Sequence, residues 1–189
     1  MKRVIVCVVL VLLFTLSSAC SSRPSLQLIN SNVSITNDES KVGSIGITEG
    51  DKKGQKLVPT ALYYEFTVKN AGNKIIGGTG DKSLQAKIIP NDKLVNTSKE
   101  VVGFNIFNPK SYMDTGAGYG SSIAGMIKPK EEGKLTLYYE LGVDEENPQV
   151  PLKVPSKDKL KRLVDDALKA SLVVTLENEE IARFDLMKR

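Results

Sequence analysis

Alternation of apolar and polar side chains is the feature that most limits how this chain can fold. In one segment Leu62, Tyr64, Phe66 and Val68 occupy every second position, with Tyr63, Glu65, Thr67 and Lys69 between them. Successive side chains of a β-strand point to opposite faces of a sheet, so this spacing predicts a strand with one buried face. The segment ends in Asn70-Ala71-Gly72-Asn73, residue types that tolerate the positive φ of a turn.

The same alternation recurs along the chain. It is clear at Leu135, Leu137, Tyr139 and Leu141 and again at Leu84, Ala86 and Ile88. Weaker patterns predict strands near Val33 to Thr36, Val42 to Ile47 and Val101 to Phe107. Leu172 to Leu176 and Ile181 to Leu186 flank Glu177-Asn178-Glu179, which predicts a hairpin. About eight short strands separated by Gly, Pro and Asn turns are typical of an antiparallel β-sandwich.

One segment has helical spacing instead. Between Pro155 and Ser171 the apolar residues follow an i, i+3, i+4, i+7, i+8 pattern: Leu160, Leu163, Val164, Ala167 and Leu168. Ser156 is a suitable N-cap residue. We therefore expect a mainly β fold, an antiparallel β-sandwich with one amphipathic helix, from Ser156 to Lys169, before a C-terminal hairpin. The helix is expected to pack across an end or edge of the sandwich.

The start of the chain has the pattern of a signal peptide. Lys2 and Arg3 precede an apolar run from Val4 to Phe14, which is shorter than the ~20 residues that cross a bilayer as a helix. Small residues before Cys20 also fit an ordinary signal peptidase site, which would give a secreted protein. We predict a signal peptide at residues 1–19, a leash at residues 20–25 and a single β-sandwich domain at residues 26–189.

Leu16-Ser17-Ser18-Ala19-Cys20 resembles the lipobox of bacterial lipoproteins, with the aliphatic residue one place early. The resemblance implies cleavage before Cys20 and a diacylglyceryl group on its sulfur. Two acyl chains suffice for stable anchoring. The protein would then be lipid-anchored at the extracytoplasmic face of the cell membrane, and the membrane would be its first partner.

The chain lacks the residue types that several kinds of metal site and enzyme require. The chain has no histidine and no tryptophan, and Cys20 is its last cysteine. Zinc, copper and iron sites draw on His or Cys, and Ser-His or Cys-His catalysis needs His, so we expect no such metal, no cofactor and no such enzyme. Basic and acidic residues are interspersed, which argues against a nucleic-acid partner. Asp144-Glu145-Glu146-Asn147 offers oxygen ligands but lacks EF-hand spacing, and we interpret it as a solvated loop.

Two stretches resemble immunoglobulin-like, telokin-like domains of bacterial surface lipoproteins. They are the strand and Asn-x-Gly turn from Tyr64 to Lys74 and the turn and strand from Pro129 to Leu137. The resemblance implies an immunoglobulin-like sandwich, and a group that includes adhesion and extracytoplasmic sensing modules. The chain departs from the pattern by the helix before its last hairpin.

The region from Asn108 to Gly125 shows no clear period and is predicted to be a long loop, of the kind that is often functional or mobile. Its Tyr112 and Tyr119 offer rigid apolar area for stacking on a sugar or peptide, or else fold back onto the sheet. The leading hypothesis is a non-catalytic interaction module for a protein partner or cell-wall component. The alternatives are a small-ligand or glycan receptor using this loop, and a carboxylate-based hydrolase.

Overall fold

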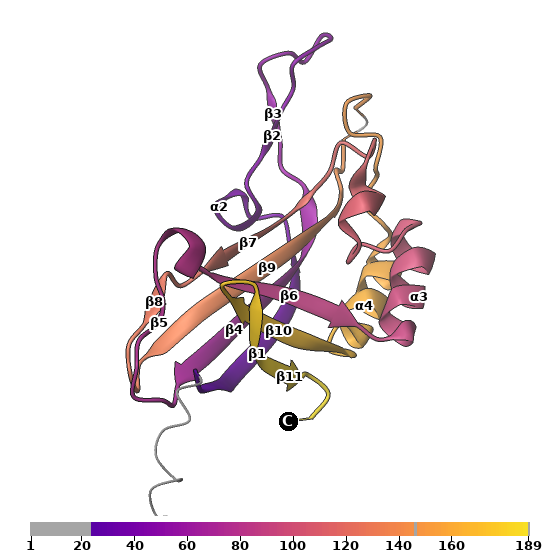
Figure 1. Cartoon of the computed structure of the whole chain (residues 1–189). Helices are drawn as coiled ribbons and strands as arrows, with labels where there is room; N and C mark the ends of the chain where they lie inside the picture. The colour runs from indigo at the N-terminus through magenta and orange to yellow at the C-terminus, as the bar shows by residue number, and fades with distance from the viewer. Residues whose placement is uncertain (1–23, 146, 189) are drawn as a thin grey trace, which may run out of the picture.

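Two antiparallel sheets contain most of the strand residues in the computed structural model, which describes residues 24–145 and 147–188 (Figure 1). The four-stranded sheet has the order β1 (Leu26–Thr36), β4 (Thr60–Asn70), β9 (Glu132–Gly142), β7 (Tyr119–Ile123). The three-stranded sheet has the order β11 (Glu179–Asp185), β10 (Ala170–Leu176), β6 (Leu84–Pro90). The predicted mainly β, antiparallel sandwich is confirmed, whereas its immunoglobulin-like identity stays a prediction.

The core lies between these sheets. Phe66 of β4 and Leu172 of β10 belong to one cluster of buried apolar side chains, and both are fully buried. Tyr64 is also fully buried, and its hydroxyl donates to the Ala167 carbonyl oxygen at 3.0 Å, which satisfies its polar atom. The alternation read from β4, β9 and β10 therefore identifies the side chains that face inward.

The outer face of β4 is partly covered as well. Tyr63, which the alternation places on the polar side, is 8% exposed and packs in a small cluster with Val42 and Ala61. The ammonium group of Lys41 lies over its ring, 5.4 Å from the centroid. Tyr63 also faces Tyr138 in the β4–β9 register, so the two outward tyrosines pair across strands.

The predicted helix is present as α4 (Lys157–Asp166), and it packs against a second helix, α3 (Asp92–Val102), at one end of the sandwich. The prediction of a strand from Val101 to Phe107 is wrong. Asn91 caps α3 by accepting the Leu94 N–H at 3.0 Å, and Gly103 ends it with φ of 101°. The adjacent β-branched residues Val101 and Val102 favour a strand in the sequence but form the last turn of this helix.

The remaining elements are short. The expected strand from Val42 to Ile47 is mostly wrong: the chain forms a helical turn, α2 (Glu39–Val42), and then β2 (Ile45–Gly46), which pairs with β3 (Lys56–Leu57). β5 (Ile76–Gly77) pairs with β8 (Met126–Ile127).

The predicted loop from Asn108 to Gly125 is wrong in part, because it contains the 3-10 turn η2 (Pro109–Tyr112) and β7. A further 3-10 turn, η1 (Gly80–Lys82), precedes β6.

Strand register defines two ends of the four-stranded sheet. Leu26 pairs with Asn70, and Lys69 pairs with Glu132, so the described chain enters the fold at one end, which we call the proximal end. Thr60 pairs with Gly142 at the opposite, distal end. The β2–β3 hairpin projects from the distal end, whereas β5 and β8 lie at the proximal side (Figure 1).

Candidate functional site

A small apolar cleft of about 260 Å³ lies between the two sheets where their edge strands, β6 and β7, approach each other. Ile88 and Ile89 of β6 form one wall, and Tyr119 and Ser121 of β7 form the other. The segment Ile106 to Pro109 closes one side, and Leu137 and Tyr139 of β9 form the floor. Because Tyr119 is 50% exposed and Ile89 is 39% exposed, the cleft presents apolar surface to solvent.

Aromatic rings line one side of this cleft. The Phe107 and Tyr139 rings meet at a centroid distance of 4.8 Å, and the Tyr119 ring stacks on that of Tyr139 at 6.5 Å, with 24° between the ring planes. Burial raises the pKa of Tyr139, so its hydroxyl stays protonated at neutral pH. The floor is therefore a neutral aromatic surface whose rings pack on one another.

The structure brings the two sequence-predicted tyrosines together, with ring centroids 5.6 Å apart, but gives them different environments. Tyr112 is 7% exposed, and its hydroxyl donates to the Glu140 carbonyl oxygen at 3.1 Å. Only Tyr119 of the pair offers its ring to the cleft. Ligand binding by Tyr112 and Tyr119 stays a prediction. Of the two rings, only that of Tyr119 is available for stacking on a ligand.

One edge of β7 faces away from its sheet. The Glu140 N–H donates to the Gly118 oxygen at 2.9 Å, and the Ala124 N–H donates to the Lys134 oxygen at 3.0 Å. Hydrogen-bonded and non-hydrogen-bonded pairs alternate in an antiparallel ladder, so the backbone groups of Tyr119, Ser121 and Ile123 point away from β9. β7 is the last strand of its sheet and carries no charged residue, so this edge can accept another strand.

A partly buried carboxylate lies behind β7. Glu140 is 8% exposed, and its Oε2 atom accepts the Gly118 N–H at 2.6 Å. Burial raises the pKa of this carboxyl group, and the Gly118 hydrogen bond opposes the shift. The carboxylate thus holds the start of β7 beside the cleft.

The Glu140→Gln variant should be more stable than the wild type at neutral pH. An acid whose pKa is raised on folding stabilises the fold below its unfolded pKa, near 4.5, and this stability is lost as pH rises through the raised value. Glutamine keeps an oxygen for the Gly118 N–H and carries no charge. Thermal unfolding across this pH range should show a flatter profile for the variant; identical profiles would contradict a buried, titrating Glu140.

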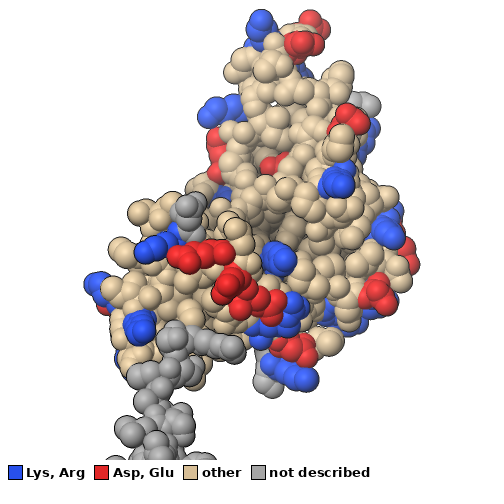
Figure 2. Space-filling view, viewed as in Figure 1, with Lys and Arg blue, Asp and Glu red and all other residues tan. Residues whose placement is uncertain are grey.

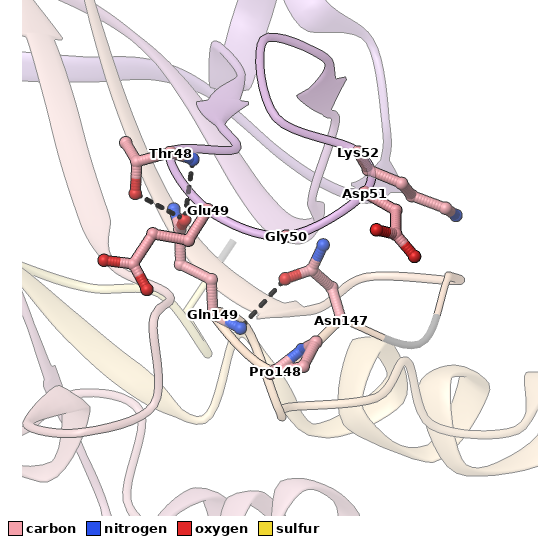
Figure 3. Close-up of a pocket in the computed structure, with 8 residues that line it drawn as sticks. All are labelled: Thr48, Glu49, Gly50, Asp51, Lys52, Asn147, Pro148 and Gln149. Atoms are coloured by element: carbon pink, nitrogen blue, oxygen red, sulfur yellow. Dashed lines mark hydrogen bonds between the residues drawn. The ribbon is translucent and has the colours of Figure 1, made fainter.

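A second hollow, of about 730 Å³, lies at the distal end between residues 48–52 of the β2–β3 hairpin and residues 147–149 (Figure 3). Gln149 joins the two segments: its Oε1 accepts the Thr48 N–H at 3.0 Å, and its Nε2 donates to the Gly46 oxygen at 2.8 Å. Lys52 also forms an ion pair with Glu145. These polar groups bond to each other, so the hollow is a junction of solvated loops.

Charged side chains do not single out another site. On the face shown in Figure 2, acidic and basic residues are interspersed and are densest near the β10–β11 hairpin. Within residues 24–145 and 147–188, no group of three His, Cys, Asp or Glu side chains is placed to hold a metal ion. Glu146, part of the acidic loop considered for calcium, lies outside the described residues, as does Cys20.

Comparison with known proteins adds no family to these observations: no protein-family model, curated protein or solved structure matches the chain. No helix of the described part is long and apolar enough to cross a membrane.

Sequence reasoning found Tyr119 but missed the other residues of the cleft. Ile88 and Tyr139 were identified as inward-facing core residues, with no sign that an edge of the core is open. Phe107 fell in a segment mistaken for a strand. The glycine, serine and tyrosine composition of β7, which has no charge to protect a sheet edge, was the available signal.

Proposed function

We propose that this protein is a membrane-anchored extracytoplasmic lipoprotein whose sandwich is a non-catalytic interaction module for a protein partner. The partner contributes an extended segment that binds at the β6–β7 cleft. The observation that carries the proposal is the combination of an apolar cleft with an adjoining, uncharged strand edge that points away from its sheet.

An extended segment satisfies both parts of this surface. Its backbone pairs with the outward N–H and C=O groups of Tyr119, Ser121 and Ile123, as in other cases of strand addition to a sheet edge. Successive side chains of the segment alternate between the two faces of the sheet, so one of them points into the cleft. Because ligand pockets usually measure about 300–1,000 Å³, a cleft of about 260 Å³ suits one apolar side chain better than a whole small molecule.

The lining favours a peptide over a glycan. A sugar needs polar groups around the stacking ring, whereas Ile88, Ile106 and Phe107 surround Tyr119 with apolar surface. Tyr112, the second tyrosine of the receptor hypothesis, is buried and bonded to the Glu140 backbone. Glycan binding is therefore kept as an outcome of the test.

Photocrosslinking in intact cells tests the module. A photoreactive phenylalanine analogue in place of Tyr119 should form an adduct with one protein, because position 119 borders the cleft. The same analogue at Met113, which is 72% exposed in the same region but outside the cleft, should form none. The Ser121→Pro change removes an outward N–H without breaking the β7–β9 ladder and should abolish the adduct while leaving the melting temperature close to wild type.

Equal adducts at both positions, or an adduct that survives Ser121→Pro, would contradict binding at the β7 edge. Saturable retention of cell-wall fragments by the full chain, lost in Tyr119→Ala, would favour the receptor instead. Turnover of a wall polymer would refute a non-catalytic role.

The anchor has a separate test at Cys20. Mass spectrometry of the membrane fraction should find a diacylglyceryl group on this residue as the mature N-terminus. The Cys20→Ala change should release the chain from membranes or block its processing, since the thioether can no longer form. An unmodified Cys20 on a freely secreted chain is the result that would reject the anchor.

A further inference from the structure

Two apolar side chains are exposed at the proximal side of the fold. Ile75, just before β5, is 57% exposed, and Met126, in β8, is 61% exposed. Lys74 precedes Ile75, and Lys128 and Lys130 follow β8. We call these five residues the proximal patch.

Hydrogen bonds from the buried Asn70 hold together the two segments of the proximal patch, Lys74–Ile75 and Met126–Lys130. The Asn70 side chain donates from Nδ2 to the Lys74 oxygen at 2.7 Å and to the Ile127 oxygen at 2.9 Å. Ile76 pairs with Ile127 in the β5–β8 ribbon. The exposed apolar residues and the lysines are therefore fixed to the sheet end on which the chain enters the fold.

The surroundings of the proximal patch are basic. The two segments that carry it, residues 69–75 and 126–132, together contain four lysines and two glutamates. Lys128 lies 3.8 Å from Glu131, and Lys130 donates to the Ala71 carbonyl oxygen at 2.6 Å. An exposed isoleucine and methionine with surrounding lysines fit the boundary between acyl chains and anionic headgroups.

We propose that the proximal patch rests on the membrane and contacts anionic lipid, an inference that depends on the lipid anchor proposed above. Five residues, Ser21 to Ser25, separate Cys20 from β1, so the sheet begins at most roughly 20 Å from the acylated cysteine. The Ala71 N–H donates to the Ser25 oxygen at 2.8 Å, which places the end of this leash beside the turn that leads to Ile75. The anchor thus delivers this surface, and no other end of the sheet, to the bilayer.

This contact fixes the orientation of the module. Ile75 and Met126 enter the headgroup region, and the lysines bind lipid phosphates. The β2–β3 hairpin, at the distal end, is then held away from the membrane (Figure 1).

Fluorescence quenching in nanodiscs tests the contact on the lipidated full-length mature protein. Lipidation blocks the Cys20 sulfur, so a bimane probe attaches only to a cysteine introduced by Ile75→Cys or, as the control at the hairpin tip, Asp51→Cys. In discs of phosphatidylcholine and phosphatidylglycerol that carry headgroup nitroxides, the Ile75→Cys probe should lose most of its emission and the Asp51→Cys probe should keep it. Adding Lys74→Glu and Lys128→Glu should restore emission at Ile75→Cys.

The possible failures are distinguishable. A lipidated chain that stays in the disc while the Ile75→Cys probe remains unquenched overturns the membrane contact and leaves the anchor intact. Equal quenching at both positions overturns the fixed orientation. A mature chain without lipid at Cys20, read by mass spectrometry of the same sample, overturns the anchor itself and with it the contact.

Discussion

The Phe66→Ala variant should lose about 3–5 kcal/mol of unfolding free energy, the usual cost of removing a buried phenylalanine ring. Phe66 is fully buried in the core between the two sheets, and its ring stacks on that of Tyr64 at 5.9 Å. The close-packed surroundings come from rigid strands of both sheets, so the cavity can close only in part. Urea unfolding monitored by circular dichroism measures the change, with the slope of the transition as a check on two-state behaviour.

Thr67→Ala is the matched control for this variant. Thr67 is the next residue of β4, is half-buried and points to the opposite face of the sheet. It should cost much less than Phe66→Ala, and equal losses would mean that the alternation does not define the core.

The inward faces of the long strands were predictable because one simple period governs them. The core residues expected from the alternation, Leu62 to Val68 of β4 and Leu135 to Tyr139 of β9, are buried. In β1 the pattern was harder to see, because a bulge between Leu28 and Asn30 shifts the inward side from even to odd positions. Only the part from Val33 to Thr36, after the bulge, was therefore predicted.

Helix α3 was missed although its signals are in the sequence. Asn91 is an N-cap residue, Leu94, Ser98 and Val101 lie on one helical face, and Gly103 ends the helix. Two of the buried positions are polar, Thr97 and Ser98, so the face does not look apolar. Their hydroxyls are satisfied by Asp166 and by the Phe104 backbone, partners that only the tertiary structure supplies.

The candidate cleft was predictable only as far as Tyr119. Its walls belong to β6 and β7, strands of different sheets whose approach depends on the strand order of the whole sandwich. Alternation identifies an inward face but does not say which strands are edges. The cleft exists because the core is open at this edge. That opening depends on the strand order, which no local sequence pattern predicts.

Asn70 begins the turn from Asn70 to Asn73 at the proximal end, and its side chain makes three hydrogen bonds. It is fully buried, and its side chain uses both polar atoms: Nδ2 donates to the carbonyls of Lys74 and Ile127, and Oδ1 accepts the Gly72 N–H at 3.0 Å. It is also the asparagine of the Asn-x-Gly stretch on which the predicted resemblance to immunoglobulin-like domains rests, and that resemblance stays a prediction. Here that asparagine joins the end of β4 to Lys74, which precedes β5, and to Ile127 of β8.

The Asn70→Ala variant should lose several kcal/mol, because each buried group left without a partner costs about 1–3 kcal/mol. Asn70→Asp keeps the size but puts a carboxylate oxygen against two carbonyl oxygens, so burial and repulsion should raise the pKa of the new group. Its stability should therefore fall as pH rises above about 4, the ordinary aspartate value, whereas Asn70→Ala should show no such added dependence. Thermal unfolding from acidic to neutral pH measures both effects. Asn73, which is exposed in the same turn, supplies the control. The Asn73→Asp variant should unfold with a pH profile close to that of the wild type. If Asn73→Asp and Asn70→Asp lost the same stability, the charge in the turn, and not the hydrogen bonds of Asn70, would account for the effect.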